Sequence, residues 1–159
     1  MRKIRIVFFA SAIAFAAGAL FAQTAPASSS GTNQVPEFDH TTVYVRDVAK
    51  SVEFYGKVLG LERIPDPFKD DKHVWFRAGA HSQLHIVGGA TQATPHEIEV
   101  HCAFRVTSLD EFRAKLDRLG VAYRNLNGGG KMSVRTDGVH QIYFQDPDGY
   151  WIEVNDDKF

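Results

Sequence analysis

One arrangement of predicted elements occurs twice in this chain of 159 residues, and it constrains the fold more than any other feature. An alternating, β-branched segment at 40–45 precedes an amphipathic helix that Gly60 ends. The same order returns about 60 residues later, where segment 101–106 precedes a helix that Gly120 ends. Two units of this kind indicate an internal duplication, because a solenoid is built from three or more repeats.

Both copies carry local signals for the same elements. Asp47 and Ser108 are expected to cap the two helices, and Glu111 completes a capping box with Ser108. Asp146-Pro147-Asp148-Gly149 predicts a tight turn between two β-rich runs. The other predicted strands are 61–64, 73–77 and 83–87 in the first copy and 121–126, 141–145 and 150–155 in the second. The pattern predicts an α+β fold of two βαβββ modules, each with a helix on one sheet face.

Four side chains are expected on the sheet faces that the helices leave uncovered. Strand alternation places His40, His85, His101 and Glu153 there, and Leu-His-Ile around His85 matches Ile-Glu-Val around Glu153. Imidazole and carboxylate ligands suit a divalent metal such as Fe, Zn, Ni, Mn or Co. His85 is either a fourth ligand or a residue that supports the ligands. Glu153 is also the candidate catalytic base, and its alternative is a solvated residue on an edge strand.

Further residues are candidates for contact with a substrate. Trp151, Phe144 and Tyr44 are expected to form an aromatic wall, or else to belong to the ordinary core. Arg105 either holds an anionic group or pairs with a neighbouring acid. Lys131 follows three glycines, and this loop is expected to act as a flap over the uncovered face.

The N-terminus has the features of a secretory signal. Basic residues precede an apolar run at 6–22, and small residues follow, so cleavage is expected near residue 22 or 27. We expect an exported protein, periplasmic or secreted, with no stable membrane association after processing; the alternative is an uncleaved anchor. Removal of this leader takes away three basic residues and changes the formal net charge from −1 to −4, which disfavours nucleic acid as a partner. The expected parts are a signal at 1–22, a linker at 23–36, and one domain at 37–159 made of modules 37–95 and 96–159.

Three motifs resemble the vicinal oxygen chelate superfamily, which includes glyoxalase I, extradiol dioxygenases and bleomycin-resistance proteins. They are H-T-T-V-Y-V-R-D with S-V-E-F-Y-G-K-V-L-G-L, then H-C-A-F-R-V, and finally D-P-D-G-Y-W-I-E. The resemblance covers about 37–155 and implies that the modules form a cup-shaped mixed sheet. It also implies a divalent metal on His40, His85, His101 and Glu153, a small-molecule substrate, and a homodimer whose cup is closed within one chain or shared between two.

The resemblance leaves three functions open. The first is a metal-dependent, glyoxalase-like lyase or isomerase that polarises a substrate with two neighbouring oxygens. The others are a small-molecule binding or resistance protein without chemistry, and an Fe(II) dioxygenase of the extradiol type. Two positions depart from glyoxalase I, which usually has Glu where this chain has His85, and whose human-type form has a glutathione-binding Arg where this chain has Tyr44.

Overall fold

The computed structural model describes residues 35–158. The predicted signal at 1–22 and nearly all of the predicted linker lie outside this range. Residues 36–159 form one compact unit. Within the described part of the chain, no helix combines the length and the hydrophobicity that crossing a membrane requires.

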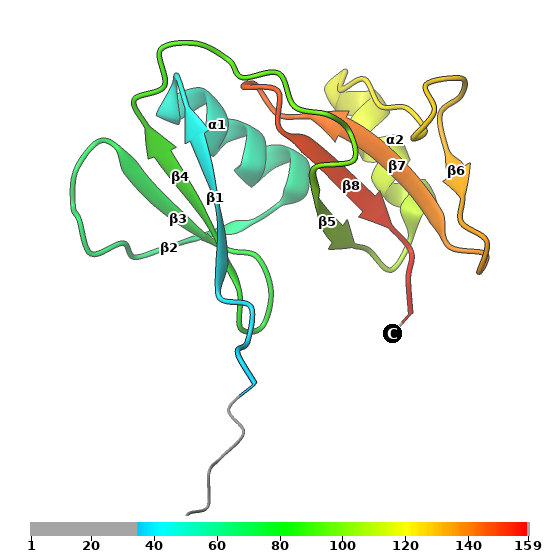
Figure 1. Ribbon diagram of the computed structural model, residues 1–159, viewed down its shortest axis with the longest axis horizontal. Coiled ribbons are helices and arrows are strands. Elements are labelled where there is room, and N and C mark those ends of the chain that lie inside the picture. Colours follow the sequence, from blue (N-terminus) through cyan, green and yellow to red (C-terminus); the bar gives the residue numbers. More distant parts are fainter. Residues whose placement is uncertain (1–34, 159) are drawn as a thin grey trace, which may run out of the picture. The chain divides into compact units, whose positions relative to one another are not determined.

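The first module is a four-stranded mixed sheet with one helical segment (Figure 1). In chain order its elements are β1 (His40–Val45), α1 (Val48–Phe54), the π-helical turn η1 (Tyr55–Leu59), β2 (Glu62–Ile64), β3 (His73–Arg77) and β4 (Gln83–Gly88). The strand order is β1-β4-β3-β2, with β1 parallel to β4 and the other pairs antiparallel.

The second module repeats this topology. Its elements are β5 (His101–Arg105), α2 (Leu109–Leu119), β6 (Ser133–Val134), β7 (His140–Gln145) and β8 (Trp151–Asn155). The strand order is β5-β8-β7-β6, and β5 runs parallel to β8 as β1 does to β4. The predicted α+β fold of two βαβββ modules is therefore confirmed, as two four-stranded mixed sheets.

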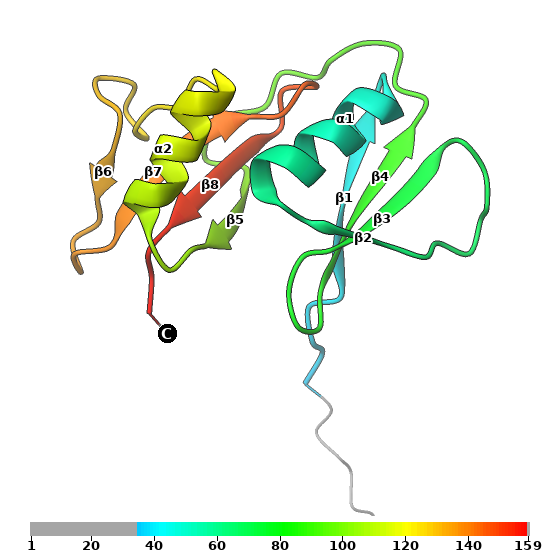
Figure 2. The same ribbon diagram turned by 180° about the vertical axis from the view of Figure 1, so that it is seen from behind.

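The helices begin and end where the sequence predicts. Asp47 Oδ1 accepts a hydrogen bond from the Lys50 backbone N–H at 3.1 Å, and Ser108 Oγ accepts one from the Glu111 N–H at 3.3 Å. Gly60 and Gly120 end the helical segments with φ of 76° and 67°, a conformation that costs glycine least. Figure 2 shows each helix in front of the sheet of its own module.

A single hydrophobic core joins the two modules. The ring of Phe144 from β7 lies 6.2 Å from the rings of both Phe54 at the end of α1 and Phe112 on α2. The other large, fully buried side chains of this core include Tyr55, Phe76, Leu84, Ile86, Leu116, Ile142 and Ile152. Burial of apolar surface on this scale is the main stabilising contribution to the fold.

The turn between β7 and β8 adds polar links between the modules. Asp146 Oδ1 accepts hydrogen bonds from the backbone N–H groups of Asp148 and Tyr150, each at 2.9 Å. Its Oδ2 accepts the Tyr55 hydroxyl at 3.0 Å. The buried Asp148 carboxylate accepts the Arg46 Nε–H at 2.7 Å. Asp146 is thus the hub of the turn and its bond to Tyr55 ties the turn to the first module.

The predicted strand at 121–126 is wrong. Of these residues, only Arg124 pairs with the sheet, through an isolated bridge to Tyr143, and the strand that completes the sheet is β6. The chain turns away from the sheet directly after Arg124. The Asn125 N–H donates to the Gly130 carbonyl at 2.7 Å, and the Gly128 N–H donates to the Asn125 carbonyl at 3.2 Å. This turn leaves no extended backbone to form a longer strand.

Candidate functional site

All four predicted ligands lie on the sheet faces opposite the helices. On β1, Val43 and Val45 are buried in the core, whereas His40 is exposed on the other face. The sheet register shows the duplication directly. His85 of β4 pairs with the residue two positions after His40, and Glu153 of β8 pairs with the residue two positions after His101. Each module therefore presents two candidate ligands in the same geometry.

The pair in the first module is a stack of rings. His85 lies between Trp75 and His40, with ring centres 4.1 Å from each and interplanar angles of 3° and 15°. The His85 Nε2 atom is 2.9 Å from Gln83 Oε1. Burial and the neighbouring His40 lower the pKa of His85, although Asp39 opposes them. His85 is therefore held neutral, which is the form of imidazole that binds a metal.

The pair in the second module joins an imidazole to a carboxylate. His101 Nδ1 is 2.7 Å from the Ile98 carbonyl oxygen, which can only accept, so Nδ1 carries a proton. In the neutral ring, Nε2 then presents a lone pair to Glu153 Oε2 at 3.1 Å. Two acceptors at this distance require a proton or a cation between them. A histidine with one nitrogen fixed on a backbone carbonyl is also the usual arrangement of a metal ligand.

Glu153 is almost completely enclosed, with 4% of its surface exposed. Its Oε1 accepts hydrogen bonds from the amides of Gln141 at 2.8 Å and Asn155 at 2.6 Å, and its Oε2 accepts the Tyr143 hydroxyl at 2.7 Å. Burial works to raise the pKa of Glu153, but these three donors and His101 together lower it below the ordinary value. The side chain is an ionised carboxylate with a fixed orientation.

The structure joins His40 to His85 and His101 to Glu153, but it does not bring the two pairs together. Within residues 35–158, no group of three or more His, Cys, Asp or Glu side chains lies close enough to hold a metal ion. The chemistry of each pair nevertheless suits a metal: a neutral, buried imidazole in one, and an oriented imidazole beside an ionised carboxylate in the other. Each chain therefore presents two halves of the predicted donor set.

The structure places the residues that were predicted to contact a substrate in different environments. Tyr44 is exposed on the helix-free face of β1, and Trp151 is half-buried on the same face as Glu153. Phe144 lies in the core on the helix side of β7, so its ring is closed to a substrate. Lys131 Nζ is directed toward α2, 3.7 Å from Asp117 Oδ1. Arg105 is exposed at the end of β5.

The sequence reasoning missed the residues that support the ligands. Trp75 and Tyr143 are the residues opposite His85 and Glu153 in the sheet register, and each contacts its candidate ligand. Gln141 shares the face of Tyr143 two positions earlier in the strand. The alternation that placed the ligands would also have placed these residues. Arg124 was missed because its segment was predicted as a complete strand.

A cavity of about 240 Å³ lies beside His101. Its walls include Thr42 of β1, Cys102 of β5, and Trp151 of β8. Burial raises the pKa of the Cys102 thiol, so this cysteine is present as the unreactive neutral form. The cavity gives the His101 side chain access to a space of small-molecule size.

Comparison with known proteins identifies the family. The sequence matches the Glyoxalase/Bleomycin resistance protein/Dioxygenase superfamily over residues 37–154. It is 28% identical to Glyoxylase I 4 of Arabidopsis thaliana, over 73% of this chain and 68% of that protein. It is 25% identical to lactoylglutathione lyase of Pseudomonas putida, over 74% of this chain and 83% of that protein.

A solved structure agrees with the sequence comparisons. The fold is similar to that of a Bacillus anthracis protein assigned to the glyoxalase family, with a TM-score of 0.64, 28% identity, and coverage of 79% of this chain and 98% of that one. The duplicated modules, the matching register of the two side-chain pairs and the family match over 37–154 agree, and this chain belongs to the glyoxalase/bleomycin resistance/dioxygenase superfamily.

Proposed function

We propose that two copies of this chain form a metal site together, with His40 and His85 from one copy and His101 and Glu153 from the other. The observation that carries this proposal is the separation of the donor set into two half-sites. Within the described residues, β1 and β5 each pair with a single strand, so each lies at the edge of its sheet. A symmetric dimer that brings the β1 face of one copy against the β5 face of the other would complete two equivalent sites.

The proposed reaction is that of a glyoxalase-like lyase or isomerase. The four residues would hold a divalent metal, which would supply Lewis-acid polarisation for a substrate that has two neighbouring oxygens. Glu153 is the residue that accepts and returns a proton, since it is ionised and has a fixed orientation. The Tyr143, Gln141 and Asn155 donors hold Glu153 in position throughout. The relationship to lactoylglutathione lyase supports this reaction class.

Mixed dimers test the shared site. A chain with His40→Ala and His85→Ala keeps one half-site, and a chain with His101→Ala and Glu153→Ala keeps the other. Each double variant alone is expected to lose metal by elemental analysis. When the two are unfolded, mixed and refolded, random pairing restores about a quarter of the wild-type metal content, because one site in each mixed dimer is intact. A site closed within one chain would recover no metal, and full metal content in either double variant would remove the proposed site.

Substrate assays test the reaction class. Metal-loaded wild-type protein is expected to convert the hemithioacetal of methylglyoxal and glutathione, or a related substrate with two neighbouring oxygens. Glu153→Gln is expected to reduce kcat about a hundredfold or more, because a general base contributes about 10²–10⁴. Oxygen uptake with catechols would instead assign a dioxygenase, and ligand binding without turnover would assign a binding protein.

We also propose that the protein is exported after cleavage near residue 22 or 27. The basic residues and apolar run at the N-terminus support this location. Mass spectrometry of protein from a cell fraction outside the cytoplasm should find a mature N-terminus near one of these positions. A full-length chain confined to the cytoplasm would contradict the proposal.

A further inference from the structure

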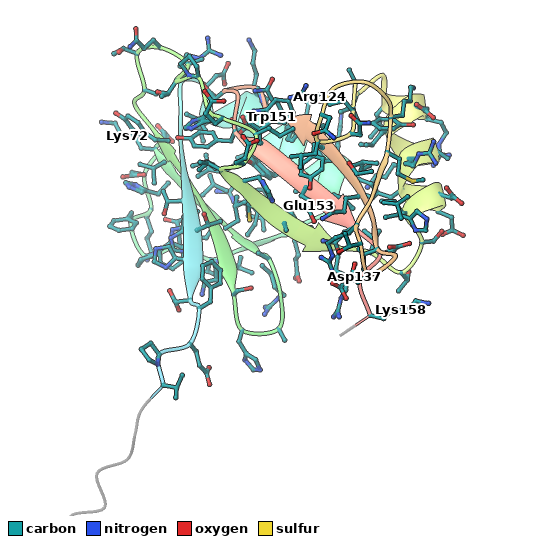
Figure 3. All side chains as sticks on the ribbon, turned by 45° about the vertical axis from the view of Figure 1, so that its right-hand side comes forward. Lys72, Arg124, Asp137, Trp151, Glu153 and Lys158 are labelled. Atoms are coloured by element: carbon teal, nitrogen blue, oxygen red, sulfur yellow. The ribbon has the colours of Figure 1, made fainter. Side chains whose placement is uncertain are left out.

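Arg124 lies over the helix-free face of the second module. Its backbone is fixed by a pair of hydrogen bonds with Tyr143, at 2.9 and 2.8 Å. Its guanidinium carbon lies 4.8 Å from the centre of the Trp151 ring. Figure 3 shows Arg124 beside Trp151, with Glu153 farther along the same strand. The indole face and the bridge to the sheet therefore fix a permanent positive charge at this position.

The hydrogen-bond donors of this guanidinium are not used by other side chains. Among residues 35–158, no hydrogen bond or ion pair joins the Arg124 guanidinium to another residue, and its buried Nε lacks a partner. Gly128 leaves space for the group, since a Cβ at this position would lie 2.7 Å from Nη1 of Arg124. Nε itself is covered, so the remaining guanidinium donors, which no other side chain uses, are the groups whose position beside a candidate site indicates a ligand.

The guanidinium lies within one substrate length of the His101–Glu153 pair. Trp151, on which it stacks, is the register partner of His101 and lies two residues before Glu153 on the same face. Alternate residues of a strand are about 7 Å apart, so the ring on which the guanidinium stacks lies about one small-molecule length from Glu153. Arg124 lies in an open cavity whose walls include Tyr143, Gln145 and Trp151, and Trp151 also lines the separate cavity beside His101.

We propose that Arg124 binds a carboxylate of the substrate, at the end remote from the two oxygens that lie at His101 and Glu153. This inference rests on the proposed function and narrows its substrate class to anionic molecules. The planar guanidinium can donate two parallel hydrogen bonds to a carboxylate while it lies over the Trp151 ring. A lysine in this position would supply charge without that geometry.

Two probes that differ in one group test the proposal. 2-Hydroxyglutarate and 2-hydroxypentanoate share a hydroxy-acid end, and only the first has a carboxylate at the other end. Calorimetry on the full, metal-loaded protein is expected to show tighter binding of 2-hydroxyglutarate by about ten- to a hundredfold, the range for a charged hydrogen bond. Arg124→Gln should abolish the difference, so that the ratio of the two affinities becomes about one, and Arg124→Lys should reduce this ratio. Arg118→Gln is the control, because Arg118 is exposed on α2, and should leave the ratio unchanged.

The metal content of each variant separates this proposal from the proposed function. Arg124→Gln is expected to bind metal as the wild type does. If metal is lost in no ligand variant but Arg124→Gln still abolishes the ratio, the carboxylate site stands and the metal site does not. Equal ratios in the wild type and Arg124→Gln would show that Arg124 only packs on Trp151. Failure of the wild type to bind 2-hydroxyglutarate would overturn the proposal as well.

Discussion

Glu153 is ionised in a place where burial alone would favour the neutral acid. Three donors surround it, and the Tyr143 hydroxyl, at 2.7 Å, comes from a residue that is itself only 2% exposed. The pKa of the carboxyl is lower in the folded chain than in the unfolded one. Its ionised form therefore stabilises the fold at pH values above the ordinary glutamate range, and this contribution is lost as the pH falls through the lowered pKa.

Tyr143→Phe is expected to remove part of this stabilisation. The change deletes one hydrogen bond to a buried carboxylate and should lower the free energy of unfolding by about 1.5–3 kcal/mol at neutral pH. The difference from the wild type should shrink below the lowered pKa of Glu153, where its carboxyl is protonated in both proteins. Urea unfolding with a chelator present, at neutral and acid pH, measures both effects.

The matched control for this prediction is Tyr123→Phe. The Tyr123 hydroxyl donates to the exposed Asp117 at 3.4 Å, so its loss should cost little at either pH. A cost of Tyr143→Phe that is no larger than that of Tyr123→Phe would contradict the role given to Tyr143.

Elements whose signals are local were predictable from the sequence, and elements that depend on distant pairing were less so. Caps and terminal glycines fixed both helices within a few residues, because a cap and its acceptor lie in the same turn. The segment 121–126 has strand-like composition, but only Arg124 finds a partner, and β6 is two residues long. Strand formation requires an edge to pair with, and composition does not show where the chain leaves that edge.

The turn between β7 and β8 supports a prediction at the element scale. Asp146→Ala removes acceptors for two backbone N–H groups and the Tyr55 hydroxyl, and should cost about 3 kcal/mol of unfolding free energy or more. Asp146→Asn keeps an acceptor for the backbone and should stay within about 1 kcal/mol of the wild type. Thermal unfolding of both variants measures these effects.

The charge on Asp146 explains why asparagine should be tolerated. Burial raises the pKa of Asp146, although hydrogen bonds from Tyr150, Tyr55 and Asp148 oppose the increase. Ionisation in the folded state therefore costs stability as the pH rises above the ordinary aspartate range, and the neutral amide avoids this cost. Asp66→Ala serves as a control, since Asp66 also accepts two backbone N–H groups but is only partly buried, whereas Asp146 is buried. Equal losses in Asp66→Ala and Asp146→Ala would contradict the hub role of Asp146.

At the scale of the whole molecule, alternation along single strands predicted which face each candidate ligand occupies. The two pairs follow from it, because His85 and Glu153 occupy equivalent register positions in duplicated sheets. The separation of the pairs could not be predicted in this way. It depends on how the modules pack through Phe144, Phe54 and Phe112, and alternation along a strand does not show where that packing places one sheet face relative to the other.

A shared site requires the helix-free face at β5 to meet a second copy, which gives a prediction about Val100. This residue is 69% exposed and directly precedes His101. In an isolated chain, Val100→Asp should change the free energy of unfolding by less than about 0.5 kcal/mol, as is usual for surface positions. In a dimer it would bury a charge without a partner, so it should shift the protein toward monomer and lower its metal content together.

Val134→Asp introduces the same change on β6, at 62% exposure, and should leave both the oligomeric state and the metal content as they are. Light scattering across a concentration series, with elemental analysis of the same samples, measures the two properties. If Val100→Asp and Val134→Asp have the same oligomeric state and metal content, the face at β5 is not the surface that completes the site.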